Sequence, residues 1–181
     1  IRKAHAESPF EGLLLASPAN PNGTMLSHLD LHEICDCCTE LGIKLISDEI
    51  YHGLSYPEVT GMVDVSALQF TDQSVVINSF SKYFCMTGWR IGWMVLPSHL
   101  VRPIERLSQS LYISAPELSQ VAALHALDAV DELEQIRRGY LGNRNMLVES
   151  LPELGIEDIA PIDGQYRRYK ELKADLQKYE E

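Results

Sequence analysis

Four short apolar runs, each followed by polar or turn-forming residues, constrain the fold more than any other feature of this sequence. They are GLLLAS (12–17), IKLIS (43–47), VVINS (75–79) and IGWMVLP (91–97). Such runs are typical of strands that are buried on both faces, and these strands occur in sheets with helices on either side. The sequence therefore predicts an α/β fold in which a mostly parallel sheet is the middle layer of three (α/β/α).

The segments between and after these runs have helical patterns. Ser27 and Asp30 form a capping-box pattern, and Gly42 is a typical helix stop. Between them, apolar residues recur at helical spacing at Leu31, Ile34, Cys35, Cys38 and Leu41. VDVSALQ (63–69) predicts a short helical turn, and further helices are predicted over 100–113, 116–130 and 132–151.

Composition limits the kinds of partner. The chain has 181 residues, 45% of them hydrophobic, and a formal net charge of −11. Such a charge repels nucleic acids and anionic membranes, so we expect small-molecule ligands. No apolar run approaches the roughly 20 residues that span a bilayer, and no secretion signal is evident. Three of the four cysteines are crowded at 35, 37 and 38, unlike a disulfide framework, so we expect a cytoplasmic protein with reduced thiols.

Polar side chains collect where three of the predicted strands end. Asn20, Asp48 and residues 79–82 follow the first three runs. Because open α/β sheets bind ligands at the carboxyl ends of their strands, these residues are predicted to converge on one crevice.

Lys82 is the most reactive group in this set. The aromatic residues expected around it, Phe80, Tyr83, Phe84 and Trp89, favour its neutral amine, which is a nucleophile toward aldehydes. Ser79 and Arg90 offer a hydroxyl and a forked cation that suit a phosphate dianion.

An aldehyde that carries a phosphate is pyridoxal 5′-phosphate (PLP). Its ring withdraws electrons when a carboxylate keeps the pyridine nitrogen protonated, and Asp48 is placed for that role. Tyr51 and Asn20 can hold the phenolic oxygen.

Four motifs in order, Asn-Pro-x-Gly, Asp-x-x-Tyr, Ser-x-Ser-Lys and Gly-x-Arg-x-Gly, occur within SPANPNGT (17–24), SDEIYHGL (47–54) and NSFSKYFCMTGWRIGW (78–93). Over roughly residues 10–160 the chain resembles the class I/II aminotransferases, PLP-dependent enzymes of fold type I. The resemblance implies the fold of aspartate aminotransferase, a homodimer, and amino-group transfer from an amino acid to a 2-oxo acid.

The resemblance also implies roles for individual residues. Lys82 is then the Schiff-base lysine and the base that moves the substrate proton. Asp48 pairs with the pyridinium, and Tyr51 and Asn20 pair with the phenolate oxygen. The phosphate is held by Ser79, Ser81 and Arg90.

The resemblance further implies a division of the chain. Residues 1–135 are expected to be part of the cofactor-binding large domain, and residues 136–164 to begin the small domain with a strand in IEDIAPIDG. Residues 165–181 depart from the family and have the pattern of an amphipathic helix. The family's upstream glycine-rich loop, its ring-stacking aromatic and its downstream substrate arginine are not found, so we expect an internal fragment.

Other interpretations remain open. The same motifs fit a PLP-dependent lyase or decarboxylase of the same fold. They also fit an inactive fragment that acts as an interaction module through residues 165–181. Individual residues also have simpler explanations: Lys82 as a surface lysine, Arg90 as a brace for its loop, and Asp48 as the N-cap of a helix over EIYHGL.

NPNG is also a good β-turn, which would present Asn20. His52 could be a second catalytic base, but a single histidine beside a strand end is usually structural, and we prefer that interpretation. The cluster of His28, His32 and the crowded cysteines suggests zinc, but Cys35 and Cys38 lie on the apolar stripe, so no metal site is predicted.

Overall fold

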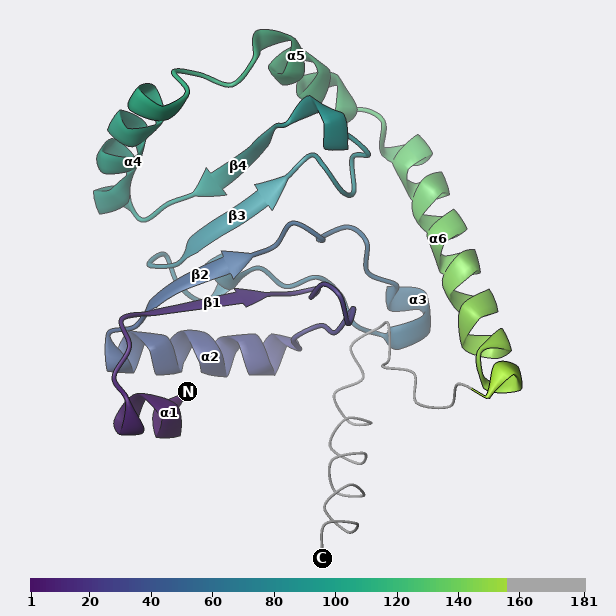
Figure 1. The fold of residues 1–181 in the computed structure, drawn as a ribbon, viewed down its shortest axis with the longest axis horizontal. Helices are drawn as coiled ribbons and strands as arrows, with labels where there is room; N and C mark the ends of the chain where they lie inside the picture. Colours follow the sequence, from purple (N-terminus) through teal and green to yellow (C-terminus); the bar gives the residue numbers. More distant parts are fainter. Residues whose placement is uncertain (156–181) are drawn as a thin grey trace, which may run out of the picture.

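The computed structural model describes residues 1–155 and contains a single four-stranded sheet (Figure 1). The strands are β1 (Gly12–Ala16), β2 (Lys44–Asp48), β3 (Val75–Ser79) and β4 (Gly92–Val95), in the spatial order β1-β2-β3-β4. β1 is parallel to β2 and β2 to β3, whereas β4 is antiparallel to β3. All four predicted strands and the mostly parallel sheet are therefore confirmed.

Helix α2 (His28–Leu41) covers one face of this sheet. Its capping box is formed, with Asp30 N donating to Ser27 Oγ at 3.1 Å, and Gly42 ends it at a φ of 68°. Leu31, Cys35 and Cys38 of α2 are buried against the strands, together with Leu45, Val76 and Ala67. The predicted apolar stripe is thus the side of the helix that forms the core.

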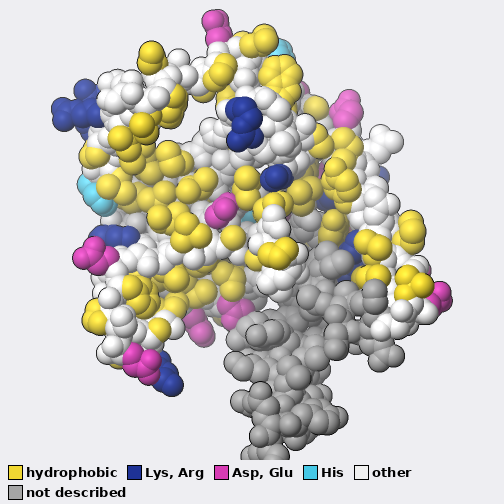
Figure 2. Space-filling model, in the orientation of Figure 1, with side chains coloured by type: hydrophobic (Ala, Val, Ile, Leu, Met, Phe, Trp, Pro, Cys, Tyr) yellow, Lys and Arg dark blue, Asp and Glu magenta, His cyan; other side chains and the backbone are white. Residues whose placement is uncertain are grey.

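The opposite face of the sheet is more open within residues 1–155. Side chains alternate along a strand, so Leu14 points away from the core that its neighbours Leu13 and Leu15 pack against. Leu14 is 68% exposed and Met94 is 45% exposed. Figure 2 shows hydrophobic side chains gathered across the middle of the face in view, over the strands and beside α4.

The remaining helices surround the sheet. They are α1 (Arg2–Glu7), α3 (Pro57–Thr60), α4 (Ser98–Leu111), α5 (Glu117–Ala126) and α6 (Val130–Ser150), with single 3₁₀ turns at Ala67–Gln69, Thr87–Trp89 and Pro152–Leu154. The short turn expected in 63–69 and the three helices expected after residue 98 are confirmed. None of the helices among residues 1–155 is both long and apolar enough to cross a membrane.

Helix α6 is continuous through the predicted domain division between residues 135 and 136. It runs past α3 along one side of the molecule (Figure 1). The strand expected in IEDIAPIDG and the amphipathic helix expected over 165–181 lie outside the described residues.

Candidate active site

Three segments meet where β1, β2 and β3 end. Asp48, the last residue of β2, is in register with Ala16 at the end of β1 and with Ile77 in β3. The segments that follow, 17–24, 48–56 and 79–91, therefore leave the sheet at the same edge, and the predicted convergence of polar residues is observed.

The first segment presents Asn20. It is closed by hydrogen bonds from Gly23 N to Ala19 O at 2.7 Å and from Ala19 N to Thr24 O at 2.9 Å, with Gly23 at a φ of 68°. The turn is therefore one residue wider than the β-turn expected for NPNG. Asn20 is exposed, and its Nδ2 donates to Tyr51 Oη at 2.9 Å, which joins the first segment to the second.

The second segment carries Asp48 and Tyr51, both half-buried. Asp48 Oδ1 accepts a hydrogen bond from Ile50 N at 3.1 Å. Successive turns follow, with His52 N donating to Glu49 O and Leu54 N to Tyr51 O. Asp48 thus stabilises a turn rather than the N-terminus of a helix over EIYHGL, and that alternative is wrong.

The third segment carries Lys82. Its ends are joined by the hydrogen bond from Phe80 N to Ile91 O, and Thr87 Oγ1 donates to Ser81 O at 2.8 Å. Lys82 is half-buried, and its Nζ lies 5.7 Å from the centroid of the Tyr51 ring. This distance allows a cation–π contact, which brings the second and third segments together. Lys82 is therefore not a free surface lysine.

The aromatic surroundings of Lys82 differ in part from the expectation. Phe80 packs on Phe84, and Phe84 packs on Tyr83, with centroid distances of 4.7 and 5.1 Å. Trp93 also contacts Phe80, at 5.0 Å, whereas Trp89 is 42% exposed. Trp93 of β4 thus joins this aromatic cluster, and Trp89, which was expected beside Lys82, is exposed.

The predicted phosphate-binding residues are brought together in part. Ser79 Oγ and Ser81 Oγ lie 3.0 Å apart, and Ser81 N donates to Ser79 Oγ at 3.0 Å. Arg90 is exposed, has a left-handed φ of 52°, and donates from NH1 to Thr87 O at 2.9 Å. The two hydroxyls form a pair, but Ser79 Oγ also lies 3.1 Å from Ile91 O, and the guanidinium likewise bonds to its own segment.

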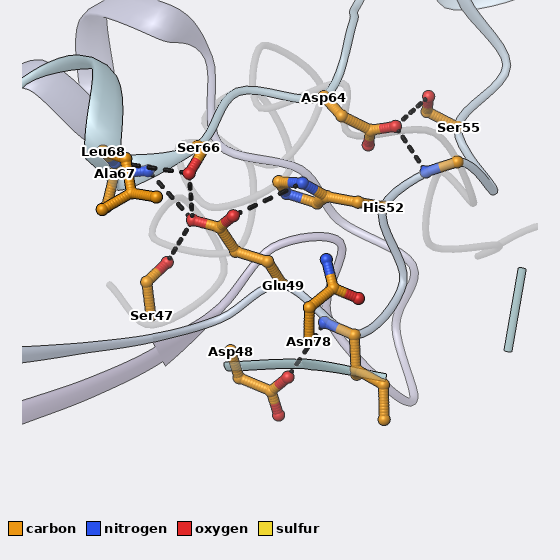
Figure 3. A network of polar contacts seen from close by, with 12 residues as sticks. Ser47, Asp48, Glu49, His52, Ser55, Asp64, Ser66, Ala67, Leu68 and Asn78 are labelled. Carbon is orange, nitrogen blue, oxygen red and sulfur yellow. Dashed lines mark hydrogen bonds and ion pairs between the residues drawn. The ribbon is translucent and has the colours of Figure 1, made fainter. Parts of the chain in front are cut away.

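Glu49 is a buried charge that the sequence reading missed (Figure 3). It is 3% exposed, and its Oε1 accepts hydrogen bonds from Ser47 Oγ, Ser66 Oγ and Ala67 N at 3.1, 3.1 and 2.9 Å. His52 Nδ1 lies 3.5 Å from its Oε2, which agrees with a structural role for His52. The only signal in the sequence was a second carboxylate directly after Asp48 at the end of an apolar run, where a buried charge requires partners.

The histidines and cysteines of α2 contact apolar groups. His28 and His32 each pack on Phe70 with centroids 4.8 Å apart. Burial raises the pKa of the Cys35 thiol to about 11, so this sulfur stays protonated at neutral pH. Within residues 1–155, no group of three or more potential metal ligands is found.

Comparison with known proteins identifies the family. Residues 1–167 match the family model of aminotransferase class I and II, so the chain belongs to this family, whose members depend on PLP. The match extends beyond the 10–160 expected from the motifs.

Individual proteins that are similar to this chain are named as aminotransferases or transaminases. Valine–pyruvate aminotransferase of Mycobacterium tuberculosis is 40% identical over 93% of this chain and 44% of its own length. Arginine–pyruvate transaminase AruH of Pseudomonas aeruginosa is 33% identical over 85% of this chain and 39% of its own. A crystal structure of an aminotransferase from Mycobacterium tuberculosis superimposes with a TM-score of 0.83 at 41% identity, covering 89% of this chain and 42% of that one. The chain thus spans less than half the length of these relatives.

The donor chemistry of the site fits PLP. An amine, a carboxylate, and a phenol bonded to an amide lie on three segments at one sheet edge, with a pair of hydroxyls at the end of β3. These groups match an aldehyde, a pyridine nitrogen, a phenolic oxygen and a phosphate, respectively. The fit is least complete at Arg90, because its guanidinium is bonded to Thr87 O.

Proposed function

We propose that this chain is part of a PLP-dependent aminotransferase that moves an amino group from an amino acid to a 2-oxo acid. The observation that carries the proposal is the joining of Asn20, Tyr51 and Lys82, from three separate segments, by one hydrogen bond and one cation–π contact. Membership of the class I and II family supports the reaction type.

When bound, PLP supplies an aldehyde and a ring that withdraws electrons from the substrate α-carbon. Lys82 holds the aldehyde carbon through its amine and, once released, moves the proton at the substrate α-carbon. Asp48 keeps the pyridine nitrogen protonated. Its bond from Ile50 N fixes the carboxylate at the end of β2, which supports this role.

Tyr51 and Asn20 act as a pair on the phenolic oxygen. Asn20 Nδ2 already donates to Tyr51 Oη, so the phenol hydrogen is free to be donated onward. Ser79 and Ser81 donate hydroxyls to the phosphate, and their 3.0 Å separation supports a joint role. Arg90 contributes after its guanidinium leaves the Thr87 carbonyl, since an Arg–phosphate pair is stronger than a bond to a neutral oxygen.

The proposal also covers the domain division, the oligomeric state and the location of the enzyme. Residues 1–135 are assigned to the cofactor-binding domain, 136–164 to the start of the small domain, and 165–181 to a divergent tail. We propose that the enzyme is a homodimer. We also propose that it is located in the cytoplasm, and the free thiols of the described cysteines support this location. Because the names of two relatives include pyruvate, pyruvate is the first 2-oxo acid to assay.

The test is a titration with PLP followed by the visible absorption spectrum, borohydride reduction and peptide mapping. We expect a visible band and a reduced label on Lys82. A Lys82→Ala variant should lose both, whereas a Lys3→Ala variant, which changes an exposed lysine, should behave as the wild type.

The outcomes separate the alternatives. A label scattered over surface lysines, or no band, contradicts the proposal and favours the inactive-fragment interpretation. Once Lys82 is labelled, amino acids are offered with and without pyruvate. Release of ammonia and a 2-oxo acid in the absence of an acceptor would identify a lyase instead.

A further inference from the structure

A polar network away from the predicted cofactor contacts joins α6 to the segments that carry Tyr51 and Lys82. Its centre is Arg137, whose side chain is 13% exposed. Arg137 Nε donates to Glu134 Oε2 at 2.8 Å, NH2 lies 2.8 Å from Glu58 Oε1, and NH1 donates to Ser55 O at 3.2 Å. One guanidinium therefore links α6, α3 and the Tyr51 segment.

The charges in this network are well matched. The hydrogen bonds that Arg137 donates to the carboxylates of Glu58 and Glu134 raise the pKa of Arg137 above its usual value. The Arg137 guanidinium in turn holds the pKa of both carboxyls below their usual range. All three side chains are therefore ionised at neutral pH, and the network is held by charge-assisted hydrogen bonds.

Tyr83 extends the network to the residue next to Lys82. Its hydroxyl donates to Glu134 Oε1 at 2.9 Å, across 51 positions of sequence. Its ring lies against Gly53, so closely that a Cβ at Gly53 would be 2.5 Å from Tyr83 Cδ2. The Tyr51 segment and the Lys82 segment therefore touch both through this ring and through the chain Tyr83–Glu134–Arg137.

The Tyr51 side of this contact is anchored separately. Asp64 Oδ2 accepts hydrogen bonds from Gly53 N at 2.8 Å and from Ser55 Oγ at 2.9 Å (Figure 3). Ser55 is also the residue whose carbonyl accepts from Arg137. Because this side is fixed, the bond between Tyr83 and Glu134 and the contact of the Tyr83 ring with Gly53 together hold the Lys82 segment against it.

We propose that Tyr83, Glu134 and Arg137, here called the α6 network, are positioning residues that set the place of the Lys82 amine relative to Tyr51. The inference rests on the proposed function, since the amine and the phenol must both reach one cofactor. The apolar core consists of other residues, so the network acts at the site more than on the fold as a whole.

Replacing one side chain of the α6 network is expected to lower the rate of labelling at Lys82 strongly. Removing the Tyr83 hydroxyl breaks the bond that joins the Lys82 segment to α6. Misplacing a reacting group by about 1 Å costs up to about 100-fold in rate. We expect Tyr83→Phe and Arg137→Met to lower the rate of borohydride-trapped label at Lys82 by about 10- to 100-fold at a fixed PLP concentration. Both should also shift the pH midpoint of the visible band.

Arg138→Met is the matched control, because Arg138 lies on the same helix with the same charge but is exposed, and it donates to a backbone carbonyl, Glu134 O, instead of to a side chain of the α6 network. Hydrogen exchange of residues 79–91, measured without PLP, is the second readout. It should be faster in Tyr83→Phe and Arg137→Met and unchanged in Arg138→Met. Tyr83→Phe keeps the aromatic ring and therefore keeps the packing on Gly53.

The results distinguish the two proposals. If the wild type is labelled at Lys82 and the variants match it in trapping rate, pH midpoint and exchange, the positioning role is overturned and the proposed function stands. If the wild type is not labelled, the proposed function fails, and the positioning role is judged from hydrogen exchange alone. Unchanged exchange of residues 79–91 in both variants then overturns the positioning role of the α6 network as well. Slower trapping with faster exchange, absent in Arg138→Met, supports it.

Discussion

Replacement of Glu49 tests whether its buried carboxylate stabilises the end of β2. In Glu49→Ala, the N–H of Ala67, a residue with 0% exposure, loses its acceptor, which costs about 1–3 kcal/mol. The hydroxyls of Ser47 and Ser66 each lose a bond worth about 1 kcal/mol. The free energy of unfolding should therefore fall by about 3–5 kcal/mol, the usual cost of breaking a buried charged contact.

Glu49→Gln should cost less. The amide retains an acceptor oxygen for the three donors but loses the charge that strengthens their bonds, so we expect a loss of about 1–2 kcal/mol. Urea unfolding followed by far-ultraviolet circular dichroism measures both variants. Glu33→Ala, at an exposed position of α2, should stay within about 0.5 kcal/mol of the wild type.

A loss below about 1 kcal/mol in Glu49→Ala, or equal losses in the Ala and Gln variants, would refute this reasoning. The first result would mean that water replaces the carboxylate at little cost, and the second that the amide oxygen of Gln does not replace the carboxylate oxygen as an acceptor. In thermal unfolding, the expected loss corresponds to a Tm about 6–20 °C lower, at about 2–4 °C per kcal/mol for a chain of this size.

Two further predictions concern pH and thiol chemistry. The hydrogen bond from Arg137 holds the pKa of Glu134 below its ordinary 4.5, so this contact stabilises the protein above that pH and is lost as the pH falls through the lower folded pKa. The stability difference between wild type and Glu134→Gln in urea should thus be present at pH 7 and decrease as the pH falls below 4.5; a difference that does not decrease there contradicts the assignment. Iodoacetamide at about pH 8 should alkylate the exposed Cys85 much faster than the buried Cys35, whose thiol has a pKa raised to about 11, and mass mapping that finds equal rates would contradict the described burial.

Much of the fold could be predicted because its signals are local. Ser27 and Gly42 mark the ends of α2 through bonds within a few residues, and apolar runs mark the strands. The meeting of Asn20 with Tyr51 was also predictable, since parallel strands place their carboxyl ends at one edge of a sheet.

The rest of the site depends on pairs of residues that are distant in sequence. Arg137 bonds to a carbonyl 82 positions away, and no periodic pattern marks such a pair. Glu49 is similar, because its acceptor role becomes visible only when residues 66 and 67 fold over it. For Arg90, the sequence specifies a cation but not the direction in which an exposed side chain points.

The contact of Gly53 with Tyr83 has a consequence for how such sequences diverge. Position 53 is restricted twice, by a left-handed φ of 88° that L side chains rarely adopt and by the aromatic ring that fills the space of a Cβ. The φ restriction still favours glycine or asparagine after the ring is lost, whereas the restriction on size disappears. Among natural variants, glycine at 53 should therefore accompany an aromatic residue at 83, and asparagine should become acceptable at 53 where 83 is small, so the two positions should change together.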